Sequence, residues 1–402
     1  MIRAGIVSIE KDNLWIGGRY YLHHLIRSIG LLPNPDKPSL IDVWWREAAA
    51  EDPYAEVRHL LNGPPIILQF PNRFWSRAVR RARRVLTGSG GAKDLFDAAR
   101  IDVCFPIPLI ENGGVPFVFW LPDFQYLCRP DLFTEERRMQ LESYYSRNVR
   151  DCAQIVLSSN DAKVVFDRIF PDRSQDAHVV RFTSVPDSEW WEKNPSDVAK
   201  QYNLPDRFLI VCNQITRHKN HLILLDALAY LKRKHKDVTI VCTGSTFDHR
   251  NEGWVNIVMS RATELGLGDR IRILGLIPRR DQIALIRRSV GLLQPSMFEG
   301  WSTAIEDAKS LGKPIIASRI PVHLEQLTLQ PQRFVECDDA VAWAGEIEEM
   351  IDTLEPGENS EQEARAAEDT MRRAQASGRG LMDALLAGAG ATTQVHRRKT
   401  GW

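Results

Sequence analysis

The chain has 402 residues, and its 52 Lys and Arg are balanced by 52 Asp and Glu, so the formal net charge is zero. This balance argues against a dedicated nucleic-acid-binding protein, which is usually strongly basic, and against a disordered acidic chain. Apolar residues make up 44% of the sequence, and no apolar run approaches the roughly 20 residues of a membrane-spanning helix.

Short apolar segments alternate with amphipathic helical segments along most of the chain. In the first half we expect strands at Ala4–Ile9, Ile66–Phe70, Asp102–Pro106, Phe117–Trp120 and Ala153–Leu157. In the second half we expect strands at Phe208–Cys212, Val238–Thr243, Ile271–Leu274, Val290–Gln294 and Pro314–Ser318. Helices are expected between them, for example at Leu222–His235 and Arg280–Arg288. This pattern predicts an α/β fold with buried parallel sheets and helices on both faces.

The alternation is interrupted at residues 185–208, which hold several charges and no strong strand. We interpret this stretch as a linker between two doubly wound, Rossmann-like domains, at residues 1–190 and 191–355, that face each other across a cleft. Residues 356–402 are predicted to form a surface helix followed by a flexible tail from Gly378 onward. Functional residues are expected in loops after strands, because open α/β sheets bind ligands there.

A pair of glycines, Gly17 and Gly18, follows the first predicted strand and precedes an amphipathic helix. Glycine lets the backbone approach a phosphate or a sugar closely. The spacing is not that of the G-x-G-x-x-G fingerprint, so a dinucleotide-dependent oxidoreductase is not indicated.

The segment Arg73–Arg84 is strongly basic, contains no acidic residue and includes several apolar ones. It can lie on an anionic membrane surface, attract an anionic acceptor, or form a solvated helix face. The N-terminal apolar run is short and lacks the cleavage region of a signal peptide. We therefore expect a cytoplasmic protein, with peripheral contact at the inner face of the membrane as one alternative.

The six cysteines form no C-x-x-C pair. A metal site or a disulfide framework is one interpretation of them. We favour small, reduced core residues.

Two loops of the second domain follow predicted strands and carry polar or small residues. The first contains Gln214, Arg217 and Lys219, and the second contains Gly244. A loop pair such as Arg217 and Lys219 is often simply solvated. Their place at the carboxyl end of a strand favours anion binding instead.

The strongest signal lies at residues 292–318, which are predicted to form strand, loop, helix, turn and strand. Thr303 is the expected N-cap of the helix and Glu306 its third residue, which makes a capping box. The backbone N–H groups of Ser302, Thr303 and Ala304 would then point into the cleft as an anion site. The alternative is a well-capped helix without a ligand.

Carboxylates flank this predicted anion site. Gly300 allows a close backbone approach, and Glu299 lies just before the helix. Asp307 is about 100° around the helix axis from Glu306, so it can face a ligand while Glu306 serves as the cap. A diphosphate with a hydroxyl-bearing group on each side fits this arrangement, and a nucleotide sugar has that layout.

The run E-G-W-S-T-A-I-E-D at residues 299–307 resembles the Glu-x7-Glu donor-binding motif of retaining family 4 glycosyltransferases, which have the GT-B fold. The resemblance implies that Glu299 contacts the transferred sugar and Asp307 the nucleotide ribose. It also places Trp301, Ser302 and Thr303 in the donor site. Asp307 is one methylene shorter than the family's Glu, which implies a weaker or water-mediated ribose contact.

The resemblance extends to the loop after Phe208–Cys212, which corresponds to the family's phosphate-binding loop. Lys219 matches the Lys that holds the diphosphate. Gln214 occupies the usual Arg position without supplying charge, so Arg217 is the expected substitute. Gly244 would border the nucleotide.

In the first domain, the resemblance is thinner. Gly17 and Gly18 correspond to a glycine-rich loop that faces the donor. The run P-D-F-Q-Y resembles a D-F-Q-H segment found in a subset of the family, with Tyr126 where His is common. Asp123 is then the ionisable candidate for a catalytic role. A polar turn around Pro122 is the alternative.

The implied reaction is retaining transfer of a sugar to an acceptor hydroxyl, in polysaccharide or other glycoconjugate biosynthesis. The expected catalytic residues are Glu299, Lys219 and Asp123, with Lys219 and the helix N-terminus stabilising charge on the leaving diphosphate. No Asp-x-Asp pair is present, so no metal and no cofactor are expected. The partners would be a nucleotide diphosphate sugar and a glycan or lipid-linked acceptor, with no nucleic acid.

Two other interpretations stay open. One is a nucleotide-sugar epimerase or hydrolase of the same fold. The other is a non-catalytic GT-B protein that binds a nucleotide sugar or a partner, which the substitutions at Gln214, Tyr126 and Asp307 would suit.

Overall fold

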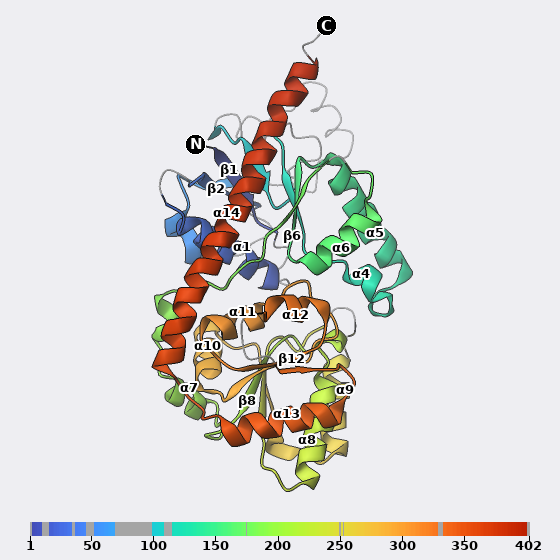
Figure 1. Ribbon diagram of the computed structural model, residues 1–402, viewed down its shortest axis with the longest axis vertical. Helices are drawn as coiled ribbons and strands as arrows, with labels where there is room; N and C mark the ends of the chain where they lie inside the picture. Colours follow the sequence, from blue (N-terminus) through green and yellow to red (C-terminus); the bar gives the residue numbers. More distant parts are fainter. Residues whose placement is uncertain are drawn as a thin grey trace, which may run out of the picture.

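A computed structural model describes residues 2–9, 16–33, 37–45, 52–68, 99–107, 115–173, 175–248, 251, 253–328 and 333–399. The segment Arg73–Arg84, with its predicted membrane contact, lies outside them. The molecule has two lobes stacked along its long axis, with the N-terminal lobe at the top of Figure 1. None of the helices in the described ranges is long and apolar enough to cross a membrane.

The N-terminal lobe contains two neighbouring parallel sheets. The first, in the order β3-β2-β1-β4, consists of β1 (Arg3–Val7), β2 (Ser39–Trp45), β3 (Ile66–Leu68) and β4 (Val103–Phe105). The second, in the order β5-β6-β7, consists of β5 (Val118–Leu121), β6 (Gln154–Leu157) and β7 (Ala177–Val179). An isolated parallel bridge between Cys104 and Phe117 connects the two sheets.

The C-terminal lobe contains one six-stranded parallel sheet in the order β10-β9-β8-β11-β12-β13. Its strands are β8 (Leu209–Cys212), β9 (Ile240–Thr243), β10 (Ile271–Gly275), β11 (Gly291–Gln294), β12 (Ile315–Ser318) and β13 (Arg333–Val335). The strand order reverses between β8 and β11. In a doubly wound sheet the loops after such a strand pair diverge and leave a crevice for a ligand.

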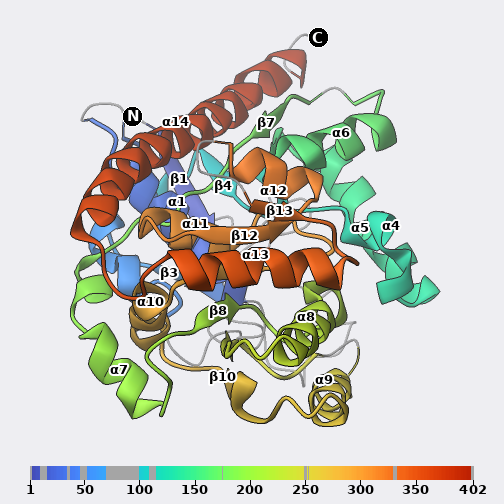
Figure 2. The ribbon, with the colours of Figure 1, turned by 60° about the horizontal axis from the view of Figure 1, so that its bottom comes forward.

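Helices cover the sheets on both faces. In the N-terminal lobe they are α1 (Ile16–Gly30), α4 (Gln125–Cys128), α5 (Glu135–Asp151) and α6 (Asn160–Ile169). In the C-terminal lobe they are α7 (Pro195–Gln201), α8 (His221–Arg233), α9 (Trp254–Glu264), α10 (Arg279–Arg288), α11 (Thr303–Ser310), α12 (Pro321–Gln326), α13 (Ala340–Thr353) and the first part of α14 (Ser360–Lys399). Helices α8 and α13 share one apolar core with the C-terminal sheet, and α10 and α11 share another (Figure 2).

Short 3₁₀ turns complete the architecture. They are η1 (Ala55–Leu60), η2 (Pro130–Leu132), η3 (Ser188–Trp191), η4 (Arg217–Lys219) and η5 (Gly268–Arg270). The segment predicted as a linker therefore contains η3 and α7, and Trp190 of η3 is buried in the C-terminal core.

The prediction of a flexible tail from Gly378 is wrong. Residues 378–399 belong to one helix, α14, which starts on the C-terminal lobe and crosses the N-terminal lobe against α1 (Figure 1). A Cβ atom on Gly378 would lie 2.5 Å from the Ser28 carbonyl oxygen, and Leu381 and Leu385 are buried in the core beside it. The small residues that suggested a tail instead allow α14 to pack closely on α1.

All ten predicted strands are present, with ends that differ by one or two residues. Strands β2, β7 and β13 were not predicted. Asp42 interrupts the apolar run of β2, and the short strands β7 and β13 each include a polar residue, His178 and Arg333. The six cysteines are free. The prediction that they are core residues is wrong for Cys128, which is exposed.

Candidate active site

A cavity of about 760 Å³ lies between the two lobes, next to the crevice between β8 and β11. Residues from both lobes line it. Eleven of the thirteen residues predicted for donor binding or catalysis are among them: Gly17, Asp123, Gln214, Lys219, Gly244, Glu299, Gly300, Trp301, Ser302, Thr303 and Asp307. The strand order therefore gathers most of the predicted residues at one site.

Gly18 and Arg217 do not line the cavity. Both glycines belong to the first turn of α1, so the predicted glycine-rich loop is the start of a helix. The Arg217 side chain is 48% exposed and its Nη1 lies 3.5 Å from Oδ2 of Asp131, in the other lobe. Arg217 is therefore placed for a contact between lobes, and the prediction that it substitutes for the missing Arg at the diphosphate has no support from its position.

The centre of the cavity wall is an ion pair between Lys219, in η4, and Glu299, in the loop after β11. The Lys219 Nζ donates to Glu299 Oε1 at 2.5 Å, and Gln294 Nε2 donates to the same oxygen at 2.8 Å. Burial raises the pKa of Glu299, but the nearby Lys219 ammonium and the hydrogen bonds outweigh it, so the pKa is lowered. Glu299 is therefore an ionised acceptor at neutral pH.

Helix α11 begins beside this pair, but its N-cap is Ser302 and not Thr303 as predicted. The Ser302 hydroxyl accepts from the Ile305 amide, while the Ser302 amide donates to Gln326 Oε1 at 3.2 Å. The Ser302 amide is thus unavailable to an anion. Among the described residues, the amides of Thr303 and Ala304 have no hydrogen-bond partner, so the predicted anion site is reduced to these two.

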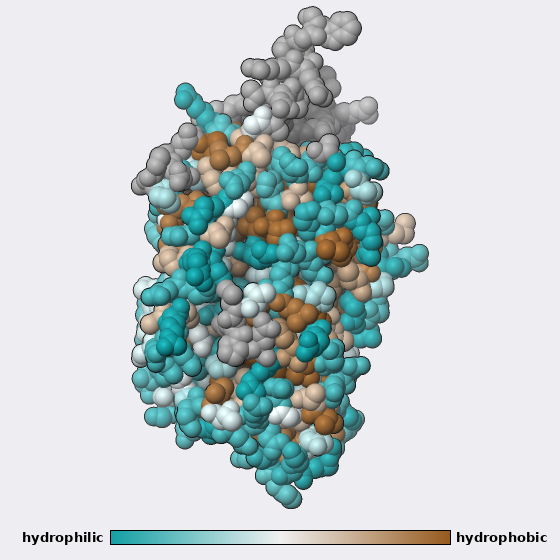
Figure 3. Space-filling view, viewed as in Figure 1, coloured by the Kyte–Doolittle hydropathy of each residue, from teal (hydrophilic) through white to brown (hydrophobic). Residues whose placement is uncertain are grey.

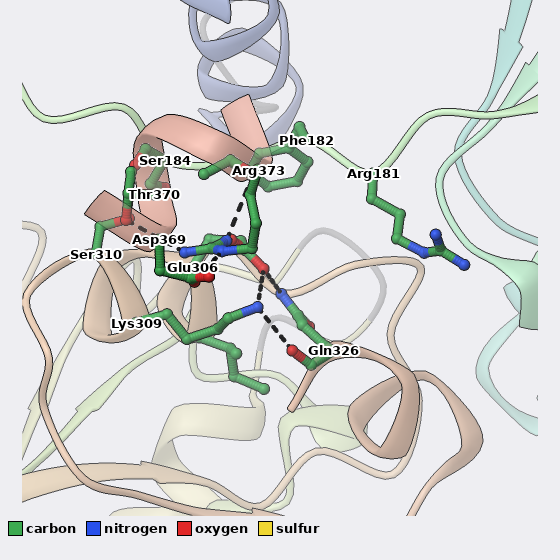
Figure 4. Close-up of polar contacts among 12 residues, drawn as sticks. Arg181, Phe182, Ser184, Glu306, Lys309, Ser310, Gln326, Asp369, Thr370 and Arg373 are labelled. Carbon is green, nitrogen blue, oxygen red and sulfur yellow. Dashed lines mark hydrogen bonds and ion pairs between the residues drawn. The ribbon is translucent and has the colours of Figure 1, made fainter. Parts of the chain in front are cut away.

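Glu306 does not complete a capping box. Its side chain is fully buried on the side of α11 away from the cavity, where it pairs with Lys309 and with Arg373 of α14 (Figure 4). The capping box failed because the N-cap lies one residue earlier, which moves Glu306 to the fourth helical position.

The backbone at Gly300, which was predicted to lie close to a ligand, also lies close to the N-terminal lobe. A Cβ atom at this position would lie 2.6 Å from the Pro122 carbonyl oxygen and 3.0 Å from Asp123 Cβ. Gly300 therefore allows the donor-side loop to touch the loop that carries Asp123.

We expect Gly300→Ala to destabilise the protein by about 1–3 kcal/mol, because the added methyl group overpacks this contact between lobes. Gly345→Ala is the matched control, since a Cβ on Gly345 in α13 meets nothing within 4 Å. Urea unfolding of both variants measures the difference. Equal stability of Gly300→Ala and wild type would mean that the lobes do not touch here in solution.

Asp307 lines the cavity but is already engaged. Arg279, at the start of α10, donates to both carboxylate oxygens at 2.6 and 2.7 Å, and the Ser184 hydroxyl donates at 2.7 Å. Burial lowers the pKa of Arg279, but Asp307 outweighs it and the pKa is raised. The carboxylate expected on the ribose is thus neutralised by a cation that also lines the cavity.

Arg279 is the main site residue that the sequence reasoning missed. Its guanidinium carbon lies 4.8 Å from the ring centroid of Tyr20, in the other lobe, and 5.4 Å from that of Trp190. Arg279 follows β10 after three residues, so the rule that polar residues after strands line the cleft could have found it.

The D-F-Q-Y segment divides into two parts. Asp123 and Gln125 line the cavity, and Asp123 Oδ1 accepts from the Gln125 amide at 2.8 Å. Tyr126 is buried and packs on Tyr145, with ring centroids 5.6 Å apart. Tyr126 does not line the cavity, and burial raises the pKa of its phenol to about 12.

The described residues contain no group of three or more His, Cys, Asp and Glu that could hold a metal ion. His218 and His221 are both buried, and only His218 lines the cavity. Independence from metal stays a prediction.

The C-terminal lobe is similar in sequence to a known group of enzymes. Residues 194–367 match the family model described as "Glycosyl transferases group 1". The match begins at the N-cap of α7 and ends in α14, so it covers the C-terminal lobe and less than half of the chain.

A curated relative and two solved structures are similar to the chain. The O-antigen biosynthesis glycosyltransferase WclY of Escherichia coli is 23% identical over 146 residues, which are 36% of this chain and 38% of WclY. A glycosyltransferase from Rickettsia africae has a TM-score of 0.64 at 16% identity and 98% coverage of both chains. Anabaena HepE in complex with UDP and glucose has a TM-score of 0.63 at 16% identity and full coverage of both. The chain spans about two fifths of WclY, whereas the structural likeness extends over both lobes and confirms the predicted GT-B fold.

Proposed function

We propose that this protein is a retaining glycosyltransferase that transfers a sugar from a nucleotide diphosphate sugar to an acceptor hydroxyl in glycan biosynthesis. The observation that carries the proposal is the Lys219–Glu299 pair beside the α11 N-terminus, in the cavity between the lobes. The family match over residues 194–367 and the similarity to WclY, an O-antigen biosynthesis glycosyltransferase, support it.

The chemistry follows from the charges in the cavity. In the transfer, the bond from the anomeric carbon to the diphosphate oxygen breaks, and the electron pair stays on the diphosphate. Lys219 and the amides of Thr303 and Ala304 are placed to stabilise that developing charge. A new bond then forms to the acceptor oxygen.

Two carboxylates complete the proposed mechanism. Glu299 accepts hydrogen bonds from the sugar hydroxyls. The acceptor proton passes to Asp123 or to the departing diphosphate. The position of Asp123 in the lining of the same cavity, on the opposite lobe, supports this proposed role.

The direct test is release of the nucleoside diphosphate from a panel of nucleotide sugars, with and without acceptor extracts. We expect release that depends on the acceptor, a product whose anomeric configuration matches that of the donor, and full activity in EDTA. Release without an acceptor would indicate a hydrolase. Donor conversion without release would indicate an epimerase, and binding without turnover a non-catalytic protein.

A further inference from the structure

A second cavity, of about 1090 Å³, lies on the opposite side of α11 from the candidate active site. It is bounded by the chain after β7, by α11 and α12, and by α14 where it crosses between the lobes. Trp301 and Phe182 line both cavities, and the Trp301 indole N–H donates to the Phe182 carbonyl oxygen at 3.1 Å. These two residues therefore form part of the wall between the cavities.

The lining of the second cavity is rich in positive charge. Seven Lys and Arg residues line it, against three carboxylates. Figure 4 shows Lys309 and Arg373 converging on Glu306, whereas Arg181, on the chain after β7, points away from this cluster. Arg333 and Arg365 also pair with carboxylates outside the lining, which leaves five cations against the three lining carboxylates and still favours an anionic ligand.

The two buried cations keep donors for such a ligand. Lys309 Nζ donates to Glu306 and to the Gln326 carbonyl oxygen, which uses two of its three N–H groups. Arg373 donates to Asp369, Glu306, Thr183 and Thr370, which uses four of its five. Among the described residues, one N–H group of each side chain thus stays uncommitted.

Three further cations line the cavity closer to solvent. Arg365 pairs with Glu361 and Arg372 with Asp369, and both arginine side chains are more than 70% exposed. Arg181 pairs with Glu325 and is 44% exposed. The Arg365–Glu361 pair is exposed on both sides and contributes little stability, so the Arg365 guanidinium can turn to a ligand at low cost. The carboxylates of Glu325 and Asp369 are only 14% and 29% exposed, so Arg181 and Arg372 would bind a ligand beside their carboxylate partners.

The ligand class follows from charge and shape. A guanidinium group can donate two parallel N–H hydrogen bonds to two oxygens of one phosphate. A phosphate monoester carries about two negative charges at neutral pH. The aromatic rings of Trp301 and Phe182 offer an apolar surface for the rest of the molecule. We propose that the second cavity binds a phosphorylated sugar, with its phosphate held by Lys309, Arg373 and the arginines near solvent.

The test is titration calorimetry of the full chain with glucose 6-phosphate, with glucose as the uncharged control. We expect saturable binding of glucose 6-phosphate and none of glucose. The double variant Arg365→Ala/Arg372→Ala is expected to weaken binding on the order of 10- to 100-fold, because two charge-assisted contacts are lost. Arg379→Ala, an exposed arginine of α14 outside the cavity lining, should bind as the wild type does.

A variant of the candidate active site separates this proposal from the proposed function. Lys219→Met should leave glucose 6-phosphate binding intact even if no nucleotide sugar is ever bound or turned over. Binding that Lys219→Met abolishes and Arg365→Ala/Arg372→Ala leaves unchanged would place the phosphate in the other cavity and overturn the proposal. The absence of calorimetric binding at millimolar glucose 6-phosphate would also overturn the proposal. So would a protein that binds no glucose 6-phosphate but sediments with vesicles containing phosphatidic acid, because its phosphate ligand would then be a lipid headgroup.

Discussion

Lys219→Met is expected to lower the rate of sugar transfer on the order of 10²–10³-fold, which is the usual effect of removing one preorganised donor to a developing oxyanion. Lys219 is the only Lys or Arg among the predicted diphosphate contacts that also lines the cavity. Its loss would leave the amides of Thr303 and Ala304 as the remaining proposed contacts to the leaving diphosphate, while Arg279 stays paired with Asp307. The rate is measured as acceptor-dependent release of the nucleoside diphosphate.

Arg217→Ala tests whether Arg217 acts on the diphosphate, as the family resemblance implies, or only contacts the other lobe. Arg217 is in the same 3₁₀ turn as Lys219 but pairs with Asp131 outside the cavity. We therefore expect its rate to stay within a few-fold of wild type. If Arg217→Ala is as slow as Lys219→Met, Arg217 contacts the diphosphate. The family resemblance would then have predicted its role correctly, and the contact with Asp131 would be misleading.

Folding must be checked in the same experiment, because Lys219→Met also leaves Glu299 without its cation. A buried carboxylate that loses its partner destabilises the fold. The double variant Glu299→Gln/Lys219→Met removes both charges. The new amide still has an Oε1 atom that can accept the hydrogen bond from Gln294. If the double variant is as stable as wild type and still slow, the lost rate belongs to chemistry and not to unfolding.

The sequence predicted the parts of the fold that depend on local pattern. Val- and Ile-rich runs mark strands because a buried parallel strand is apolar on both faces, and all ten such runs proved to be strands. Strand order was not predictable in detail. Even so, the rule that ligands bind after strands was enough to bring Gln214, Lys219 and Glu299 to one cavity.

Two of the failures share a physical cause, because each depends on a contact between residues far apart in the chain. Gly378 suggested a tail because its contact with Ser28 of α1 is invisible in a local window. Asp307 was assigned to a ligand because Arg279 comes from another strand–helix unit. The local sequence pattern indicated where these two residues lie in the fold. Their roles depend on contacts with residues far away in the chain.

The surface adds one constraint on function. On the face seen in Figure 3, hydrophobic residues form separate patches among hydrophilic ones, and no large continuous hydrophobic area is visible outside the grey atoms. Single exposed apolar residues are normal on a globular protein. This face therefore gives no reason to place an apolar acceptor there.

Arg373→Met is expected to destabilise the protein by about 3–5 kcal/mol, the usual effect of breaking a buried ion pair. Arg373, on α14, is the cation that reaches Glu306 from outside α11, and Glu306 has no exposed surface. Losing it leaves the carboxylate with Lys309 and Gln326 only (Figure 4). Urea unfolding followed by far-UV circular dichroism measures the change. Its matched control is the neighbouring Arg372→Ala, whose exposed side chain should alter stability by less than about 0.5 kcal/mol.

The triple variant Glu306→Leu/Lys309→Met/Arg373→Met decides what the buried charges do, because Glu306 pairs with both Lys309 and Arg373. Replacing a whole buried ionic cluster with apolar residues of similar volume is often neutral, whereas removing one partner is not. We therefore expect the triple variant to recover most of the stability that Arg373→Met loses. Recovery would show that the loss came from the charge imbalance around Glu306. A triple variant as unstable as the single one would instead mean that the loss comes from the bonds of Arg373 to Asp369 and Thr370, which lie within α14.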